Sequence, residues 1–123
     1  MPANDLITTS VEHRQGVVVL AVGGEIDTNT APILHTAISE ALADKPSALV
    51  IDLSGVQIIA SAGLRVLLQT KDKVGGSADL AVVSSGGAIS KVIRLAGLDA
   101  TFLLYKTVDD ALASVSTNME SRG

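Results

Sequence analysis

The sequence predicts an α/β protein, in which a mixed β-sheet of about five strands packs with about four helices in the order β-β-α-β-α-β-α-β-α. Short runs rich in β-branched residues alternate along the chain with segments whose apolar residues recur at helical spacing. Glycines and prolines stand between most of these segments and mark their ends. The length of 123 residues suits a single domain that spans residues 1–123.

The first two strands are expected to form a hairpin. They comprise Leu6–Val11 and Val17–Val22, and the sequence Arg14-Gln15-Gly16 between them suits a tight connection. The second run, VVVLAV, is apolar on both faces, which is typical of a strand that is covered on two sides. Gly23-Gly24 is expected to end it.

A helix is predicted after Pro32, a residue tolerated only near a helix start. Its apolar stripe follows helical spacing and consists of Leu34, Ala37, Ile38, Ala41 and Leu42. Residues 28–30 (Thr-Asn-Thr) offer N-cap candidates, and Asp44-Lys45-Pro46 would stop the helix. The next β-rich run, Ala48–Leu53, is the predicted third strand.

The second half of the chain repeats this alternation. A second helix is expected to begin at Ala60–Gly63 and to end at Gly75-Gly76. A fourth strand, Leu80–Val83, leads to a third helix that ends at Gly97, and Phe102–Tyr105 is the predicted fifth strand.

The last helix is expected to begin near Thr107. Asp110 follows three residues later, which resembles a capping box with Asp in place of Glu. The polar tail, residues 116–123, is expected to be disordered.

Composition and charge exclude several classes of protein. The net charge of −4 argues against binding along a nucleic-acid backbone, which requires clustered positive charge. The chain has no cysteine, so disulfides, thiolate catalysis and cysteine-based metal sites are impossible. Its two histidines, His13 and His35, lack the partners of a metal site, and we expect neither a metal nor a cofactor.

The sequence also shows no sign of a secretion signal or a membrane-spanning segment. The N-terminus has no basic start followed by an apolar block, so it does not read as a signal peptide. The longest convincing apolar run, Val17–Val22, is too short to cross a bilayer. We therefore expect a cytoplasmic protein that contacts neither nucleic acid nor a membrane.

Ser61 is the strongest candidate for a functional residue. It stands at the predicted start of the second helix, and its small neighbours Ala60, Ala62 and Gly63 leave the hydroxyl open. A serine at such a position commonly caps backbone N–H groups, which contributes about 1 kcal/mol. The same N–H groups and the helix dipole favour anions, so the fold would tolerate a phosphate on Ser61, which adds about −1.5 to −2 charge.

Two catalytic patterns are incomplete in this chain. The string around Ser61 half-resembles the G-x-S-x-G of hydrolases, but Ile59 replaces the first glycine and both histidines precede the serine. Asp52 ends a buried strand, as the phosphorylated aspartate of a response-regulator receiver does, and Lys106 could supply that family's lysine. No acidic pair follows the first strand, however, so the receiver motif is incomplete.

Glu25 and Asp27 form a pair of carboxylates after the second strand. General acid–base catalysis would require them to flank a substrate, and nothing else in the sequence marks a substrate pocket. We interpret them as loop acids. The glycine-rich segment Gly86–Lys91 has the wrong spacing for a phosphate-binding loop and is interpreted as a helix start.

Several motifs resemble one family over almost the whole chain. Gly24–Asp27, followed by Thr30-Ala31-Pro32, resembles the G-E-[LI]-D…T-A-x-x-L signature of the STAS domain. Asp52–Val56 and Ile59–Leu64 resemble the strand, phosphorylation site and helix start of that domain, and Leu95–Leu98 is similar too. The chain looks like a free-standing bacterial anti-sigma factor antagonist, or anti-anti-sigma factor.

The resemblance implies a regulator of transcription that is not an enzyme. In that family a serine at the place of Ser61 is phosphorylated by the anti-sigma factor, a serine kinase of the GHKL ATPase type. The unphosphorylated antagonist binds this kinase and releases the sigma factor; phosphorylation ends the binding and a phosphatase restores it. The implied partner surface comprises two short segments: Asp27, Thr28, Asn29, Ser61, Ala62, Gly63, Leu64 and Arg65.

Two positions depart from the family's usual D-S-[ST]-G. Ala60 replaces the acid and Ala62 replaces the second hydroxyl, which leaves Ser61 as the only acceptor in the motif. Two alternatives stay open. Instead of a phosphorylation-gated antagonist, the chain is then either an interaction module of a larger signalling complex that is not gated by phosphorylation, or a small-ligand sensor or enzyme that uses the Ser61 loop.

Overall fold

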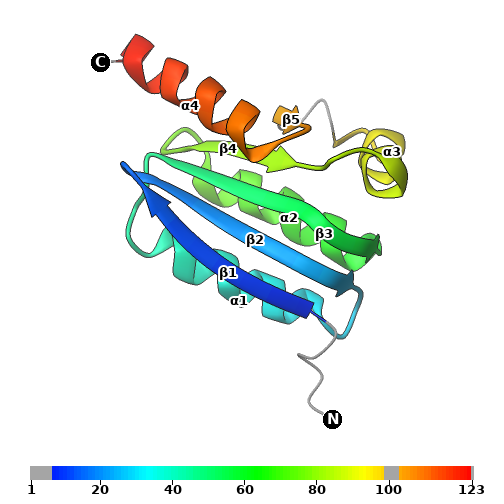
Figure 1. Ribbon diagram of the computed structural model, residues 1–123. Coiled ribbons are helices and arrows are strands. Elements are labelled where there is room, and N and C mark those ends of the chain that lie inside the picture. Colours follow the sequence, from blue (N-terminus) through cyan, green and yellow to red (C-terminus); the bar gives the residue numbers. More distant parts are fainter. Residues whose placement is uncertain (1–6, 99–102, 123) are drawn as a thin grey trace.

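The sheet begins with an antiparallel hairpin (Figure 1). The computed structural model describes residues 7–98 and 103–122. The hairpin consists of β1 (Ile7–Arg14) and β2 (Val17–Ile26). Leu6, predicted to begin the first strand, lies outside the described residues. β1 is exposed along nearly all of its length, whereas the first four residues of β2 are buried, as expected for an edge strand beside a covered one.

Three parallel strands complete the sheet, whose order is β1-β2-β3-β4-β5. They are β3 (Ala48–Ile59), β4 (Asp79–Val83) and β5 (Leu103–Tyr105), each parallel to its predecessor. Phe102, predicted to begin the fifth strand, lies outside the described residues. The mixed five-stranded sheet and the order of elements confirm the predicted fold class.

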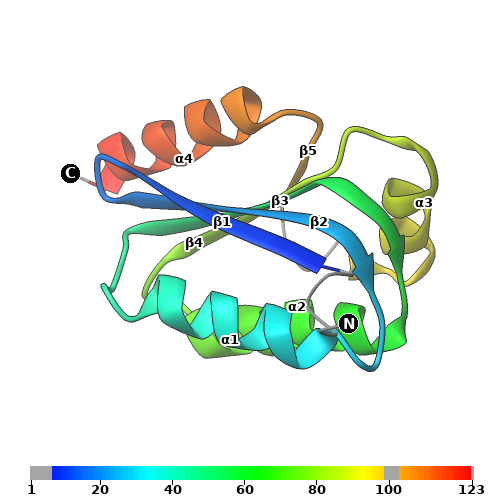
Figure 2. The ribbon, with the colours of Figure 1, turned by 60° about the horizontal axis from the view of Figure 1, so that its bottom comes forward.

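Helices cover both faces of the sheet (Figure 2). α1 (Ala31–Leu42) and α2 (Ser61–Val74) lie side by side on one face, and α4 (Val108–Arg122) lies on the other. α3 (Gly87–Leu95) contributes to the larger core, which it shares with α1 and α2, whereas α4 closes a second, smaller core. Among the helices in the described part of the chain, none is long and apolar enough to span a membrane.

α4 begins as predicted but extends further than predicted. The amide of Asp110 donates to Thr107 Oγ1 at 3.0 Å, which is the expected cap. The tail that we expected to be disordered from residue 116 is instead helical to Arg122. No glycine or proline interrupts residues 108–122, so a helix that is anchored in the core by Ala111 and Val115 continues to the end of this segment.

β2 and β3 also run beyond their predicted ends. Gly23-Gly24 does not end β2, which continues to Ile26, and β3 continues past Leu53 to Ile59. The two extensions pair with each other, Gly23 opposite Gly55, and a Cβ added to Gly55 would lie 3.2 Å from Gly23 Cα. The glycines therefore allow the close approach of two strands rather than a chain reversal.

α2 is seated against these strand extensions because residue 63 has no side chain. Gly63 is buried in the first turn of α2. A Cβ added there would lie 2.9 Å from Ile59 Cγ1 and closer still to Ile26 Cγ2. Glycine lowers helix propensity by about 1 kcal/mol relative to alanine, so its presence here reflects this close packing.

Substitution of Gly63 tests that packing. Gly63→Ala is expected to lower the free energy of unfolding by about 1–3 kcal/mol, because overpacking outweighs the gain in helix propensity. Gly76→Ala is the matched control, since no atom lies within 4 Å of a Cβ added there, and its effect should stay within about 0.5 kcal/mol. Urea unfolding curves measure both changes, and wild-type stability in Gly63→Ala would contradict the packing.

Candidate functional site

Ser61 is the first residue of α2, and its side chain is exposed. The N-cap position belongs to Ala60, whose extended backbone (φ −93°, ψ 173°) is followed by helix and whose side chain makes no capping hydrogen bond. The hydroxyl of Ser61 therefore does not have the capping role that is common for a serine at a helix start. It makes no hydrogen bond with the described part of the chain and is free to react or to contact another molecule.

The backbone around Ser61 is held by three hydrogen bonds. The amide of Ala60 donates to the carbonyl oxygen of Ile26 at 2.8 Å, and the carbonyl of Ala60 accepts from the amides of Gly63 and Leu64 at 2.9 and 3.2 Å. Within the described residues, no acceptor is recorded for the amides of Ser61 and Ala62. The start of α2 thus exposes donors and the positive end of the helix dipole beside a free hydroxyl.

The loop between β2 and α1 is organised by Asp27 and Thr30. Asp27 Oδ1 accepts from the amides of Asn29 and Thr30 at 2.9 and 3.0 Å. Thr30 is fully buried; its hydroxyl donates to the carbonyl oxygen of Glu25 and accepts from the amide of Asp27, both at 2.8 Å. Asp27 therefore positions this loop through its carboxylate, and Thr30 uses its hydroxyl inside the loop instead of capping α1.

The structure brings the two predicted segments together. Thr28 from the loop lines a shallow hollow of about 230 Å³ between α1 and α2, together with Ala62 and Arg65. Asn29 is exposed on the same loop, and Leu64 is half-buried against the core.

Gly63 differs from the other residues of the predicted partner surface because it is buried. Gly63 instead allows α2 to pack closely on Ile26 and Ile59, as described above.

His35 lines the same hollow and was not predicted to belong to the site. It projects from α1 and is exposed. Its place depends on how α1 packs beside α2, and the local sequence carries no signal for that packing. The hollow consequently has two basic side chains, those of His35 and Arg65, and Arg65 lies about one helical turn after Ser61 on α2.

The other sequence candidates lie apart or have a structural role. Asp52 Oδ1 accepts hydrogen bonds from the amide and hydroxyl of Ser54 at 2.9 and 2.6 Å. His13 is exposed on β1, and Lys106 is exposed after β5. Across the residues that the structure describes, no three acidic or histidine side chains are grouped so that they could hold a metal ion.

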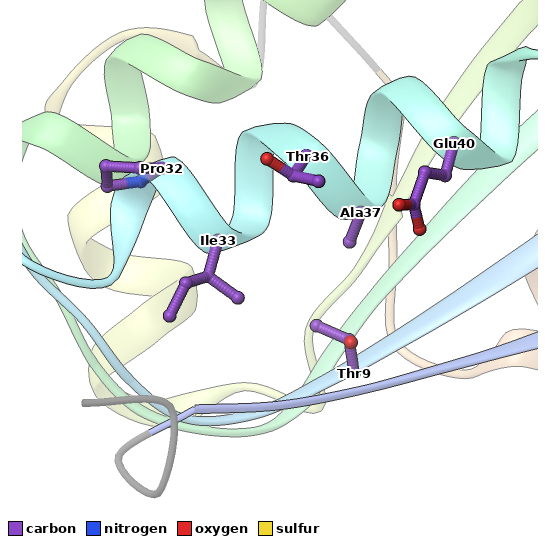
Figure 3. A pocket seen from close by; sticks show the side chains of 6 residues that line it. All are labelled: Thr9, Pro32, Ile33, Thr36, Ala37 and Glu40. Carbon is purple, nitrogen blue, oxygen red and sulfur yellow. The ribbon is translucent and has the colours of Figure 1, made fainter. Parts of the chain in front are cut away.

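A second hollow, of about 340 Å³, lies between α1 and the edge strand β1. Figure 3 shows its lining side chains, which come from one strand residue and one face of the helix: Thr9, Pro32, Ile33, Thr36, Ala37 and Glu40. The hollow contains none of the residues of the candidate site.

Comparison with known proteins supports one family. The model of the STAS domain matches residues 8–111, which is most of the chain. The chain belongs to the STAS domain family. It is 49% identical over 115 residues to the anti-sigma-F factor antagonist RsfB of Mycobacterium tuberculosis, and the match covers 94% of each protein.

Solved structures agree with this assignment. The crystal structure of an anti-sigma factor antagonist from Mycobacterium paratuberculosis has a TM-score of 0.87 and 50% identity, over 94% of this chain and 99% of that one. The phosphorylated form of the Bacillus cell fate determinant SpoIIAA has a TM-score of 0.66 at 17% identity, over 88% of this chain and 99% of that one. At this low identity, the similarity to SpoIIAA shows a shared fold.

Ala60 distinguishes the site of this STAS domain from the usual D-S-[ST]-G of the family. An aspartate at an N-cap with extended backbone accepts hydrogen bonds from the first-turn amides, and alanine cannot do so. The helix start of this chain therefore keeps its first amides available and has no carboxylate beside Ser61.

Restoring the acid tests this interpretation. Ala60→Asp is expected to raise the free energy of unfolding by about 1 kcal/mol at pH 7, because the backbone at this position already has N-cap geometry. The gain should disappear when acid protonates the new carboxylate. Urea unfolding at pH 7 and at pH 3, each compared with wild type, measures the effect; an unchanged stability at pH 7 would contradict the presence of unsatisfied amides.

Proposed function

We propose that this STAS domain is an anti-sigma factor antagonist: unphosphorylated, it binds an anti-sigma factor and thereby releases a sigma factor, and phosphorylation of Ser61 ends the binding. The observation that carries the proposal is the exposed hydroxyl of Ser61 at the start of α2, which makes no hydrogen bond within the described residues. The name of the relative that is 49% identical over nearly the full length indicates the class of partner, an anti-sigma-F factor.

Phosphorylation of Ser61 is compatible with this fold. Among the residues that the structure describes, none makes a hydrogen bond with the hydroxyl that a phosphate would break, and the neighbouring amides of the first turn favour negative charge. Arg65 lies four residues further along α2, on the same face of the helix, and its guanidinium carries the opposite charge. The domain would therefore stay folded after modification.

The phosphate is expected to act on the binding of the partner protein. A phosphoserine brings about −1.5 to −2 charge and three acceptor oxygens to a surface that the partner would otherwise desolvate. Burial of that charge without a matching cation is strongly unfavourable. Phosphorylation thus lowers the affinity between the two proteins while the antagonist itself keeps its structure.

The proposal assigns the chemistry to other proteins. The resemblance implies that the anti-sigma factor, a serine kinase of the GHKL type, transfers the phosphate from ATP to Ser61, and that a phosphatase removes it. The antagonist supplies a hydroxyl and a surface, and acts in the cytoplasm on transcription.

A STAS module that binds without phosphorylation is the second candidate. It is favoured by one observation: Ala60 and Ala62 stand where the family usually has an acid and a second hydroxyl. Binding in this case would not depend on the state of Ser61.

Intact mass spectrometry distinguishes the two candidates. After incubation with ATP and the anti-sigma-F factor encoded in the same genome, the wild-type chain is expected to gain the mass of one phosphoryl group. Ser61→Ala should gain none, because the motif offers no other hydroxyl. Ser85→Ala is the matched control, since Ser85 is also exposed but lies in the loop before α3, and it should be phosphorylated like wild type.

The outcome decides between gating and constitutive binding. Equal phosphorylation of Ser61→Ala would place the acceptor elsewhere and contradict the proposal. A wild-type chain that binds the partner and is never phosphorylated would favour the ungated module.

A further inference from the structure

Ile58 is an apolar side chain that the fold leaves exposed shortly before Ser61 in the chain. Its exposed fraction is 55%, the second highest among the large hydrophobic residues that the structure describes as exposed: Val11, Ile58, Leu68, Leu95 and Leu103. It lies on the last part of β3, three residues before Ser61 and directly before the buried Ile59.

A β-bulge gives Ile58 this exposure. Along β2, Gly24 and Glu25 are consecutive, but their partners on β3 are Val56 and Ile58, so Gln57 is an extra residue. Strict alternation from the buried Val56 would have turned Ile58 into the core and Ile59 out of it. With the bulge, Ile59 is buried, whereas both Gln57 and Ile58 are exposed.

The rest of the sheet does not cover this end of β3. The last residue of β3 that pairs with β4 is Asp52, opposite Val83, and beyond it β3 pairs only with β2. The neighbour of Ile58 across the strand pair is Glu25, and the exposed Gln57 precedes it, so polar residues flank this apolar side chain on two sides. An apolar centre with a polar rim is the usual arrangement of residues at the energetic centre of a protein interface.

We propose that Ile58 is the apolar anchor through which this protein binds its anti-sigma factor, inserting into an apolar hollow of that partner while Ser61 lies at the rim of the same contact. The inference rests on the proposed function and adds a residue outside the expected partner surface. It also supplies a physical route for the switch, because a phosphate on Ser61 would be placed beside an apolar contact, where its charge cannot be solvated.

The geometry favours a protein partner at this position. Ile58 and Ser61 lie three residues apart where β3 passes into α2, and both side chains are exposed. The exposed side chain contributes little to the stability of the free domain, and what it offers is the area that a partner can bury.

Calorimetric titration of variants into the anti-sigma-F factor of the same genome tests the proposal. Ile58→Ala and Ile58→Thr are expected to bind about tenfold more weakly than wild type or worse, as for truncation of a central interface residue. Ile58→Thr keeps a β-branched side chain and hence the strand preference at this position. Val11→Ala is the matched control, because Val11 is 47% exposed on β1, and it should bind like wild type.

Each result bears on one proposal or on both. Binding of Ile58→Ala within about twofold of wild type would overturn the anchor and leave the proposed function standing. An equal loss in Val11→Ala would also overturn it, since the effect would not be local. Failure of the wild-type chain to bind would overturn the function and the anchor together. Urea unfolding of the Ile58 variants should match wild type, so that weaker binding reports the lost contact.

Discussion

The candidate site depends on how closely the first turn of α2 approaches the ends of β2 and β3. Gly63 permits this approach, because any side chain there would meet Ile26 and Ile59. The hydrogen bond from the amide of Ala60 to the carbonyl oxygen of Ile26 fixes the turn that precedes the helix. The backbone is held on both sides of Ser61, and its side chain is exposed. Packing beneath the start of α2 thus sets the position of the hydroxyl, which makes no hydrogen bond with any residue that the structure describes.

At this end of the molecule, the side chains that stabilise the fold differ from those that remain exposed. Asp27 and Thr30 form hydrogen bonds with backbone groups of the loop, and the buried isoleucines pack in the hydrophobic core. Ser61, Arg65 and Ile58 are left exposed, and the free domain gains little from any of them. A surface of this kind can be modified or can bind without a change in fold, as the proposed switch between a binding and a non-binding state requires.

The fold could be predicted from the sequence because each element has a local signal. The apolar stripe of α1, the run VVVLAV of β2 and the cap of Thr107 are all read from neighbouring residues. The ends of β2 and β3 could not be predicted, since Gly23 and Gly55 act as a pair that is distant in sequence. The same holds for the site: the motif predicts Ser61, but the exposure of Ile58 and the place of His35 follow from a bulge and from helix packing, which involve several elements at once.

The central claim is that a phosphate on Ser61 changes affinity and leaves the fold intact. It is tested most directly by calorimetric titration of the anti-sigma-F factor of the same genome with the protein before and after complete phosphorylation of Ser61, together with urea unfolding of both forms. The account predicts an affinity that falls by about a hundredfold or more, since a repulsive or unpaired charge at an interface costs several kcal/mol, and an unfolding midpoint that stays the same. Equal affinity of the two forms, or a loss of affinity that appears only because the phosphorylated domain unfolds, would contradict it.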